Sequence, residues 1–265
     1  MSCGPMIDQS LLKNVSRVLG AMVILGFMSA CATAPTDPEE LAEYNEANDP
    51  IEPANREIFD FNNWVDRNAL KPVATAYRDT VPEGVRDSSQ NFINNVSSPI
   101  IFVNDVLQGE SGRAAETLMR FVVNSTAGMA GFFDAAGEMG LERHDEDFGQ
   151  TLAVWGVPEG PYLMLPLVGP SNVRDTVGMI AESFALDPLG YVDLVALDYY
   201  GYASTVVGGL NQRVAVIGTL DEIERTSIDY YAAIRSLYRQ TRNDQIRNGE
   251  TDAEDLAAPT LSMLE

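Results

Sequence analysis

The segment GPYLMLPLVGPSNVRD, which begins at Gly160, most constrains what this chain can fold into. Its residues are apolar enough for a protein core or a bilayer, but Pro161, Pro166 and Pro170 each lack a backbone N–H. These prolines break the segment into pieces that can form neither a helix nor a central strand. We therefore expect a stiff, irregular segment here, followed by a helix that Ser171 caps.

The rest of the folded part predicts helices, because apolar residues recur at spacings of three and four and no stretch alternates long enough for a sheet. The expected helices lie within 55–70, 81–96, 97–109, 111–124, 144–156, 171–184 and 219–247. The first should end before Pro72, and the third should begin at a Ser98 cap with Pro99 at its first position. Glycines between 125 and 141 predict a bent hairpin or a flexible loop.

The amino terminus has the features of a lipoprotein signal peptide. Lys13 and Arg17 precede VLGAMVILGFM, about eleven residues that suit a signal-peptide core but fall short of the roughly twenty needed to span a bilayer. Cys31 follows two small residues in FMSACATAP, an order that resembles the lipobox of bacterial lipoproteins. We expect residues 1–30 to be removed and Cys31 to be lipidated; an uncleaved anchor with a chance cysteine is the alternative.

Composition divides the remaining chain and excludes some partners. Residues 31–53 form an acidic, proline-punctuated tether, 54–248 a single folded domain and 249–265 an acidic flexible tail. The net charge of −22 argues against binding nucleic acid and against electrostatic attraction to anionic lipid. Because no segment of the mature chain has eighteen uninterrupted apolar residues, the lipid is the expected anchor.

The sequence offers little for catalysis. The single histidine, His144, precedes Asp145, Glu146 and Asp147, and this acidic group is the best candidate for a metal or acid–base site. The simpler interpretation is a charged turn before a helix that starts at Asp147, where the helix dipole favours a carboxylate. Nucleotide-binding motifs and a serine nucleophile elbow are missing from the sequence, so we expect no catalytic residue, no metal and no cofactor.

Several apolar residues exceed what a soluble core needs. Phe132 and Phe133 lie side by side in the glycine-rich loop, and Phe59 and Trp64 lie off the main apolar stripe of their helix. On a chain tethered to a membrane, these residues fit a surface that lies among acyl chains. Irregular backbone at membrane depth is tolerated only where protein covers it or where it lines a cavity, which points to a pore.

Five stretches of the chain also resemble the MlaA (VacJ) lipoproteins. They are NDPIEPANREIFDFNNWVD, KPVATAYRDTVPEGVRDSSQNFINNVSSPIIFVNDVLQG, RFVVNSTAGMAGFFDAAGEMGL, DFGQTLAVWGVPEGPYLMLPLVGPSNVRDTVG and DYYAAIRSLYRQTRNDQIRNGE. The similarity runs in order over about 48–250. It implies an all-α domain that forms a ring with a central amphipathic channel and carries a short glycine-rich hairpin loop.

The same resemblance implies a function and partners. Members of this family lie in the periplasmic leaflet of the Gram-negative outer membrane, beside trimeric porins. They take mislocalised phospholipid from the outer leaflet and pass it to a soluble periplasmic carrier, MlaC. The resemblance implies that Phe59, Phe61 and Asn62 border and lid the channel. It assigns the hairpin loop near the channel to Gly128, Gly131, Phe132, Phe133 and Gly137.

Two other functions stay open from the sequence. The chain could be a structural envelope lipoprotein that scaffolds porins without transferring lipid. It could also be a periplasmic hydrolase that uses the acidic group around His144.

Overall fold

The computed structural model describes residues 37, 44, 47–183 and 195–249. Cys31, the predicted signal peptide and residues 250–265 of the predicted tail lie outside the described residues. The described chain is mostly helical, as the apolar spacing predicts. Its elements are α3 (Glu52–Val65), the π-helical turn η1 (Asp66–Leu70), α4 (Lys71–Thr80), α5 (Glu83–Gln108), α6 (Ser111–Thr126), α7 (Ala135–Glu138), α8 (Phe148–Val154), β1 (Tyr162–Leu165), β2 (Gly169–Asn172), α9 (Val173–Ala181), α10 (Val195–Thr226) and α11 (Tyr230–Ile246).

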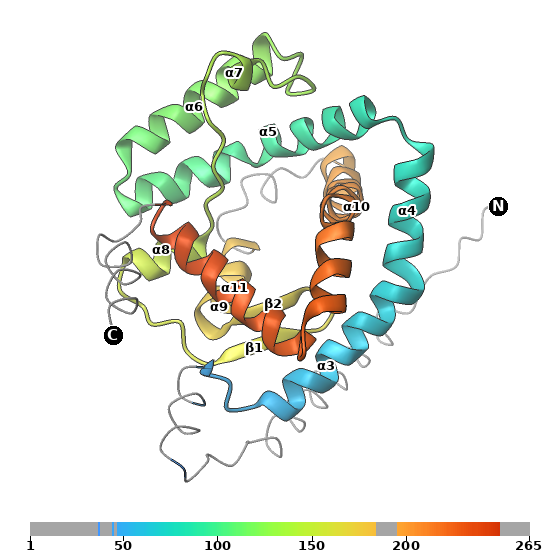
Figure 1. Ribbon diagram of the computed structural model, residues 1–265. Helices are drawn as coiled ribbons and strands as arrows, with labels where there is room; N and C mark the ends of the chain where they lie inside the picture. Colours follow the sequence, from blue (N-terminus) through green and yellow to red (C-terminus); the bar gives the residue numbers. More distant parts are fainter. Residues whose placement is uncertain (1–36, 38–43, 45–46, 184–194, 250–265) are drawn as a thin grey trace, which may run out of the picture.

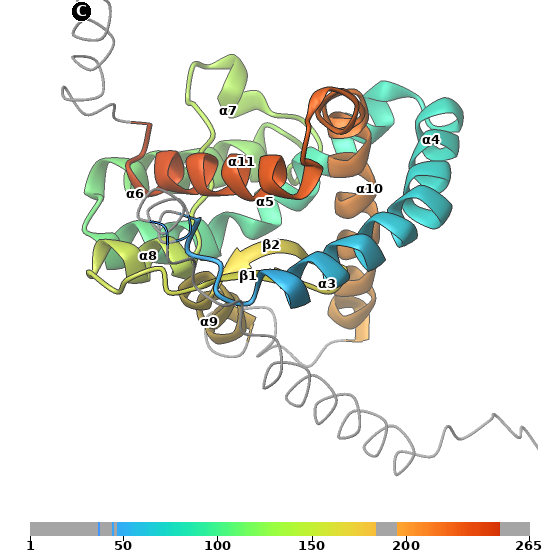
Figure 2. The same cartoon turned by 60° about the horizontal axis from the view of Figure 1, so that its bottom comes forward.

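The helices follow one another around the periphery of the molecule. In Figure 1, α3, α4 and α5 run in succession along one side, and α6 with α7 packs outside α5. Helix α10 stands inside this arc and runs alongside α4 in both Figure 1 and Figure 2. Helix α11 and the β1–β2 hairpin complete the arrangement between α8 and α3.

The first helix does not end before Pro72 as predicted. It continues through η1 into α4, where the N–H of Lys71 bonds to the carbonyl of Asp66, five residues back. Pro72 follows directly after the π turn, where the ladder of backbone hydrogen bonds is already irregular, and this position accommodates a residue that lacks a backbone N–H. The π turn thus converts an expected stop into a bend.

The two helices expected on either side of residue 97 are one helix, α5. Pro99 lies inside it rather than at its start, so Ser98 does not cap a helix. The Ser98 hydroxyl instead donates to the carbonyl of Asn94, at 3.1 Å. Gly109 ends the helix in the left-handed conformation, with φ of 83°, as predicted.

The proline-rich segment is an ordered antiparallel hairpin rather than an irregular stretch. Tyr162 pairs with Asn172, and Leu165 pairs with Gly169. In a sheet of two strands every strand is an edge, where proline is tolerated. Asn172, not Ser171, caps α9 and accepts the N–H of Asp175 at 2.7 Å.

The carboxyl-terminal prediction is also wrong in one respect. The expected helix over 219–247 is broken between α10 and α11 at Ser227–Asp229, because the Asp229 side chain accepts the N–H of Ala232 and starts a new helix.

At the amino-terminal end, the fold begins before Asn55. Asp49 is buried, and Asn48 accepts a backbone bond from Tyr162 at 2.8 Å.

The interior is rich in polar residues, whereas large apolar side chains lie outside. A small core combines Phe59, Tyr162, Met164 and Tyr231. The buried polar residues are Asp49, Asn55, Asn95, Asn104, Asp105, Thr117, Arg120, Asn124, Glu146, Gln150, Thr151, Ser171, Asn172, Arg174 and Arg242. Within 47–183 and 195–249, no helix combines the length and the apolar character that a bilayer crossing needs.

Candidate functional site

Two cavities lie next to α10, and their walls differ in chemistry. The apolar cavity has a volume of about 510 Å³ and lies between α3, η1, the hairpin, α10 and α11. Its walls include Phe59, Val65, Leu70, Met164, Leu167, Val168, Leu220, Tyr230, Ile234, Leu237 and Tyr238. The polar cavity has a volume of about 690 Å³ and lies between α5, the segment before α8, α9 and α10. Its walls include Arg86, Asp87, Gln90, Asn94, Ser97, Arg143, Asp145, Glu146, Asp147, Glu182, Asn211 and Gln212.

Helix α10 separates the two cavities. Arg213 and Leu220 face the apolar cavity and are seven residues apart, which places them on one helical face. Asn211 and Ala215 face the polar cavity and lie on the opposite side of the same turns. One stretch of helix therefore presents different chemistry to the two cavities.

Phe59 lines the apolar cavity. Its ring meets Tyr230 edge-on at 5.2 Å and Tyr231 at 5.4 Å between ring centroids. Asn62 also lines this cavity, but Phe61 does not and is 48% exposed. Of the three predicted channel residues, the structure brings two together and turns the third outward.

Two asparagines of α3 hold the hairpin in place. The Asn55 amide donates to the carbonyl of Tyr162 at 3.1 Å, and its oxygen accepts the N–H of Met164 at 2.9 Å. About two helical turns further along α3, the Asn62 amide donates to the Leu165 carbonyl at 2.9 Å, and its oxygen accepts the N–H of Leu167 at 2.8 Å. Side-chain amides thus replace a third strand at the free edge of β1.

A partly buried arginine faces the apolar cavity. Arg213 donates from Nε and Nη2 to the two carboxylate oxygens of Asp66, at 2.7 and 2.8 Å. The hydrogen bond to Asp66 raises the pKa of Arg213 despite the opposing effect of burial. The remaining nitrogen, Nη1, is buried without a partner among the described residues. Asp66 lies on the π turn, so the irregular turn supplies the counter-charge for this cavity.

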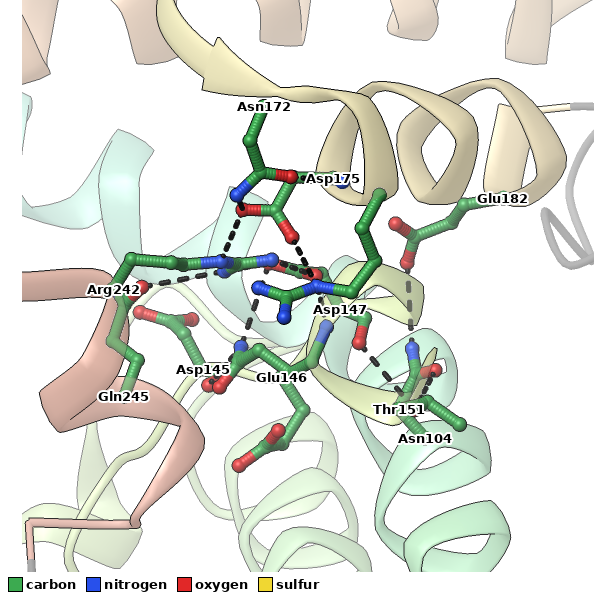
Figure 3. A network of polar contacts seen from close by, with 12 residues as sticks. Asn104, Asp145, Glu146, Asp147, Thr151, Asn172, Asp175, Glu182, Arg242 and Gln245 are labelled. Atoms are coloured by element: carbon green, nitrogen blue, oxygen red, sulfur yellow. Dashed lines mark hydrogen bonds and ion pairs between the residues drawn. The ribbon is translucent and has the colours of Figure 1, made fainter. Parts of the chain in front are cut away.

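A second arginine, Arg242, ties α11 to α8 and α9 (Figure 3). It donates to both carboxylate oxygens of Asp147 at 2.6 and 2.7 Å, and from Nε to Asp175 at 2.7 Å. Burial opposes the charge of each aspartate, but the hydrogen bonds from Arg242 outweigh it and lower the pKa of Asp147 and of Asp175. Gly149 and Gly178 permit this junction, because a Cβ on Gly149 would lie 2.6 Å from the Arg242 guanidinium and one on Gly178 would lie 2.5 Å from the Gly149 nitrogen.

Glu182 lies beside this junction and lacks such a partner. Burial, followed by the charge of Asp147, raises the pKa of Glu182 to about 7. The Asn104 amide donates to the Glu182 carboxylate over 3.5 Å, as the dashed line in Figure 3 shows. The polar cavity therefore contains a carboxyl group that carries a full charge only at an energetic cost.

His144 makes polar contacts with Asp105 and Thr117. Its Nε2 lies 3.1 Å from Asp105 and 3.1 Å from the Thr117 hydroxyl, in the interface between α5 and α6. In the part of the chain that the structure describes, no three metal-binding side chains converge. Asp147 caps α8 by accepting the N–H of Gln150 at 2.9 Å, which confirms the predicted helix start.

The glycine-rich loop is fixed by hydrogen bonds and ion pairs rather than left flexible. It lines neither the apolar nor the polar cavity. Arg120 donates to both oxygens of Asp134 at 2.8 and 3.0 Å, and Asn124 donates to Asp134 at 2.9 Å. Two of the predicted loop glycines are required for close approach: a Cβ on Gly128 would lie 2.2 Å from the Phe133 carbonyl, and one on Gly131 would lie 2.5 Å from Asn95.

The remaining predicted loop residues have separate roles. Phe132 stacks on Phe92 with ring centroids 4.9 Å apart, yet it stays 44% exposed, and Phe133 is 56% exposed. Gly137 lies in the first turn of α7 and donates its N–H to Asp134 at 3.1 Å. The loop thus presents two aromatic rings outward on a rigid base.

Exposed apolar side chains extend over several elements at the periphery. They include Trp64, Val73, Val106, Leu118, Met119, Val122, Met129, Met139, Val154, Trp155, Val173, Val177 and Ile180. We call this set the outer apolar surface.

Sequence reasoning missed the two cavity arginines and the asparagine clamps. Arg213 and Arg242 lie in helices, where the sequence alone predicts that an arginine side chain is exposed to solvent. Their partners Asp66 and Asp147 lie far away in the sequence. The one available signal was the scarcity of cationic residues, since Lys and Arg together number 17 against 39 acidic residues.

Comparison with known proteins identifies the family of this chain. A family model described as MlaA lipoprotein matches residues 47–245. An Escherichia coli K12 protein named "Intermembrane phospholipid transport system lipoprotein MlaA" is 34% identical over 243 residues, covering 90% of each chain. An uncharacterized Rickettsia felis protein is 36% identical over 205 residues, covering 77% of this chain and 80% of its own.

A solved structure from work on the "Structural basis for maintenance of bacterial outer membrane lipid asymmetry" is also similar. It has a TM-score of 0.66 and 35% sequence identity, and the match covers 75% of this chain and 98% of that one.

Proposed function

Because the chain belongs to the MlaA lipoprotein family, we propose that it is a component of an intermembrane phospholipid transport system that maintains outer-membrane lipid asymmetry. In this proposal, the protein removes mislocalised phospholipid from the outer leaflet. The lipid passes through a ring-shaped domain with an amphipathic channel and is transferred to a periplasmic carrier of the MlaC type.

The observation that carries this proposal is the pair of cavities on opposite faces of α10. Phospholipid has an apolar and a polar part, and a path for it must accommodate both. The apolar cavity offers aromatic and aliphatic walls, and the polar cavity offers charged and amide side chains. Moving two chains of about sixteen carbons through water would expose roughly thirty methylenes and cost on the order of 25 kcal/mol, so a continuous protein wall removes the main barrier.

The outer apolar surface supports a place in the membrane. We propose that Cys31 is lipidated and that the domain lies in the periplasmic leaflet of the outer membrane, with this surface among acyl chains. Phe132 and Phe133 would then contact lipid on one side of the domain. Trimeric porins are the expected neighbours within the membrane.

The test measures phospholipid in the outer leaflet of intact cells. A membrane-impermeant amine reagent labels phosphatidylethanolamine in cells with and without this protein. We expect deletion to raise the labelling and the wild-type gene to reverse the rise. Unchanged labelling in an otherwise intact envelope would contradict lipid removal and favour a scaffold that transfers no lipid.

A pair of variants connects the same assay to the apolar cavity. Thr241 lines this cavity, whereas Gln240, its neighbour in α11, is exposed and lies outside it. We expect Thr241→Trp to fill the cavity and to restore asymmetry poorly. Gln240→Trp adds the same ring outside the cavity and should restore it fully. Equal rescue by both variants would show that lipid does not use this cavity.

A further inference from the structure

The apolar cavity is long and has a buried interior. Seven residues within 230–245 line it from one side of α11, over a length of about 22 Å at 1.5 Å per residue. Phe59 and Met164 in its wall are buried, whereas Leu167 and Val168 are exposed. The cavity therefore combines a buried apolar wall with a mouth of exposed apolar side chains.

The charged groups in this wall are unusual for the protein. In a chain with 39 acidic residues and 17 lysines and arginines, the wall contains two arginines, Arg213 and Arg242, and one carboxylate, Asp66. The wall of the polar cavity has the opposite balance, with five carboxylates and two arginines. An anion is therefore accepted more readily in the apolar cavity than in the polar one.

Of the two arginines, Arg213 has hydrogen-bonding capacity left. Asp66 accepts from Nε and Nη2, and Nη1 has no acceptor among the described residues. Arg242, by contrast, is already bonded to Asp147 and Asp175. The Arg213 side chain is only 11% exposed, and a buried donor without an acceptor is unfavourable. An anionic ligand group at Arg213 would remove this deficit.

The size of the cavity suits one long acyl chain. A water molecule takes up about 30 Å³ in the liquid and a methylene group is of similar size, so about 510 Å³ holds roughly seventeen such groups. A fatty acid of about sixteen carbons has this size, whereas a phospholipid with two such chains is more than twice as large. The acyl chain of a membrane lipid covers half of the hydrocarbon core, roughly 15 Å, so it can lie along α11 within the cavity.

We propose that the apolar cavity binds a long-chain fatty acid, with its carboxylate at Arg213 and its chain along α11. The two carboxylate oxygens can accept the two N–H groups of Nη1. The chain would contact Phe59, Met164 and Ile234. A carboxylate is small enough for the buried wall at Arg213, whereas a phospholipid headgroup is not. This ligand is not the diacyl phospholipid of the proposed function, so the proposal goes beyond that function.

The experiment compares two ligands of equal chain length, palmitate and hexadecanol, of which only palmitate carries a carboxylate. Binding of each radiolabelled ligand to the purified, full-length, lipidated protein is measured at pH 8 in a non-ionic detergent. We expect palmitate to bind about tenfold more tightly, because a hydrogen bond to a charged group contributes at least this factor. Arg213→Gln should lower the affinity for palmitate about tenfold and leave the affinity for hexadecanol unchanged.

Two further variants separate the lost donor from other effects of the substitution. Arg225→Gln removes an exposed arginine of the same helix that lines neither cavity, and it should change neither affinity. Because Arg213→Gln leaves Asp66 without this cation, the double variant Asp66→Asn/Arg213→Gln removes both charges and should show the same loss. Palmitate binding that the double variant restores would overturn the inference. Thermal melts check that each variant is folded.

A second pair of variants places the ligand in the cavity. Thr241→Trp, at a position that lines the cavity, should weaken the binding of palmitate and of hexadecanol, whereas Gln240→Trp outside it should weaken neither. Equal affinities for the two ligands, palmitate binding that Arg213→Gln leaves intact, or no palmitate binding at all would each overturn the inference. These outcomes leave the proposed function standing, since that function depends on phospholipid labelling in cells. Unchanged labelling together with palmitate binding would contradict the proposed function alone.

Discussion

The apolar and the polar cavity beside α10 are bounded by different kinds of contact. The apolar cavity rests on ring packing, in which Phe59, Tyr230 and Tyr231 meet edge-on. The polar cavity rests on ion pairs, of which the bond between Arg242 and Asp147 is the most extensive. Ring packing tolerates small shifts, whereas a paired charge loses most of its stabilisation when its partner moves or disappears.

Two arginines, Arg213 and Arg242, line the apolar cavity, and they are held differently. Arg213 has one carboxylate partner, Asp66, and keeps one unpaired nitrogen. Arg242 has two carboxylate partners and reaches from α11 to α8 and α9. The comparison indicates that Arg242 holds the fold together, whereas Arg213 mainly sets the charge of a wall.

The largest expected effect comes from removing the Arg242 charge. Arg242→Gln removes the cation of Asp147 and one of the two cations of Asp175, which keeps Arg174. The Arg242 and Asp175 side chains are only 10% and 9% exposed, so this pair is buried. Losing one partner of such a buried pair typically costs about 3–5 kcal/mol. We expect a loss of unfolding free energy in this range, measured by urea denaturation of the detergent-solubilised protein.

Arg225→Gln is the matched control for this change. Arg225 pairs with Glu222 three residues earlier, and both side chains are well exposed. Exposed pairs contribute little, so we expect a change within about 0.5 kcal/mol. If the two variants were equally stable, the junction at Arg242 would not be what joins α11 to α8 and α9.

A smaller effect is expected on the hairpin that covers the apolar cavity. Asn62→Ala removes both bonds to the hairpin, to Leu165 and Leu167. Losing the partners of these backbone groups should cost about 1–3 kcal/mol. Hydrogen exchange should show the Leu167 amide opening faster, with little change at the Arg242 junction.

Asn68→Ala provides a comparison in the same helical run. Asn68 is exposed and bonds only to the Trp64 carbonyl within its own helix, at 2.7 Å. It should leave the exchange of the Leu167 amide unchanged. Faster exchange in both variants would mean that the helix, rather than the Asn62 clamp, controls the hairpin.

The contrast between these residues also shows what the sequence can predict. Helical class, the Gly109 stop and the start of α8 at Asp147 follow from local spacing and capping, because each depends on residues a few positions apart. The hairpin was missed because its free edge is satisfied by Asn55 and Asn62, more than 100 residues earlier. A local pattern contains no information about such a partner.

The same limit applies to the candidate site. Phe59 and Asn62 were assigned through resemblance, and both line the apolar cavity. Phe61 follows the same motif but faces outward, since positions 59 and 61 are about 200° apart on a helix. The polar cavity combines α5, α9 and α10 with the segment before α8, so its composition is a property of the tertiary fold.

The smallest effect expected is a pH dependence that distinguishes carboxylates within the polar cavity. The pKa of Asp147 is lowered by Arg242, so its stabilising contribution is present above the ordinary aspartate pKa of about 4 and is lost as the pH falls below it. The pKa of Glu182 is instead raised to about 7 by burial and by Asp147. Its contribution is therefore greatest below the ordinary glutamate pKa and is lost as the pH rises through 7.

Glu182→Gln should consequently raise the melting temperature at pH 8, by a few degrees for a domain of this size, and change it little at pH 5. The physical reason is that the wild-type side chain is already neutral at pH 5 and must carry an unfavourable charge at pH 8. Asp60→Asn, which removes an exposed charge outside both cavities, should give the same small change at both pH values. If Glu182→Gln instead melted at a lower temperature than the wild type at pH 8, the carboxylate would already have a cationic partner. Glu182 would then be paired like the other carboxylates of the interior.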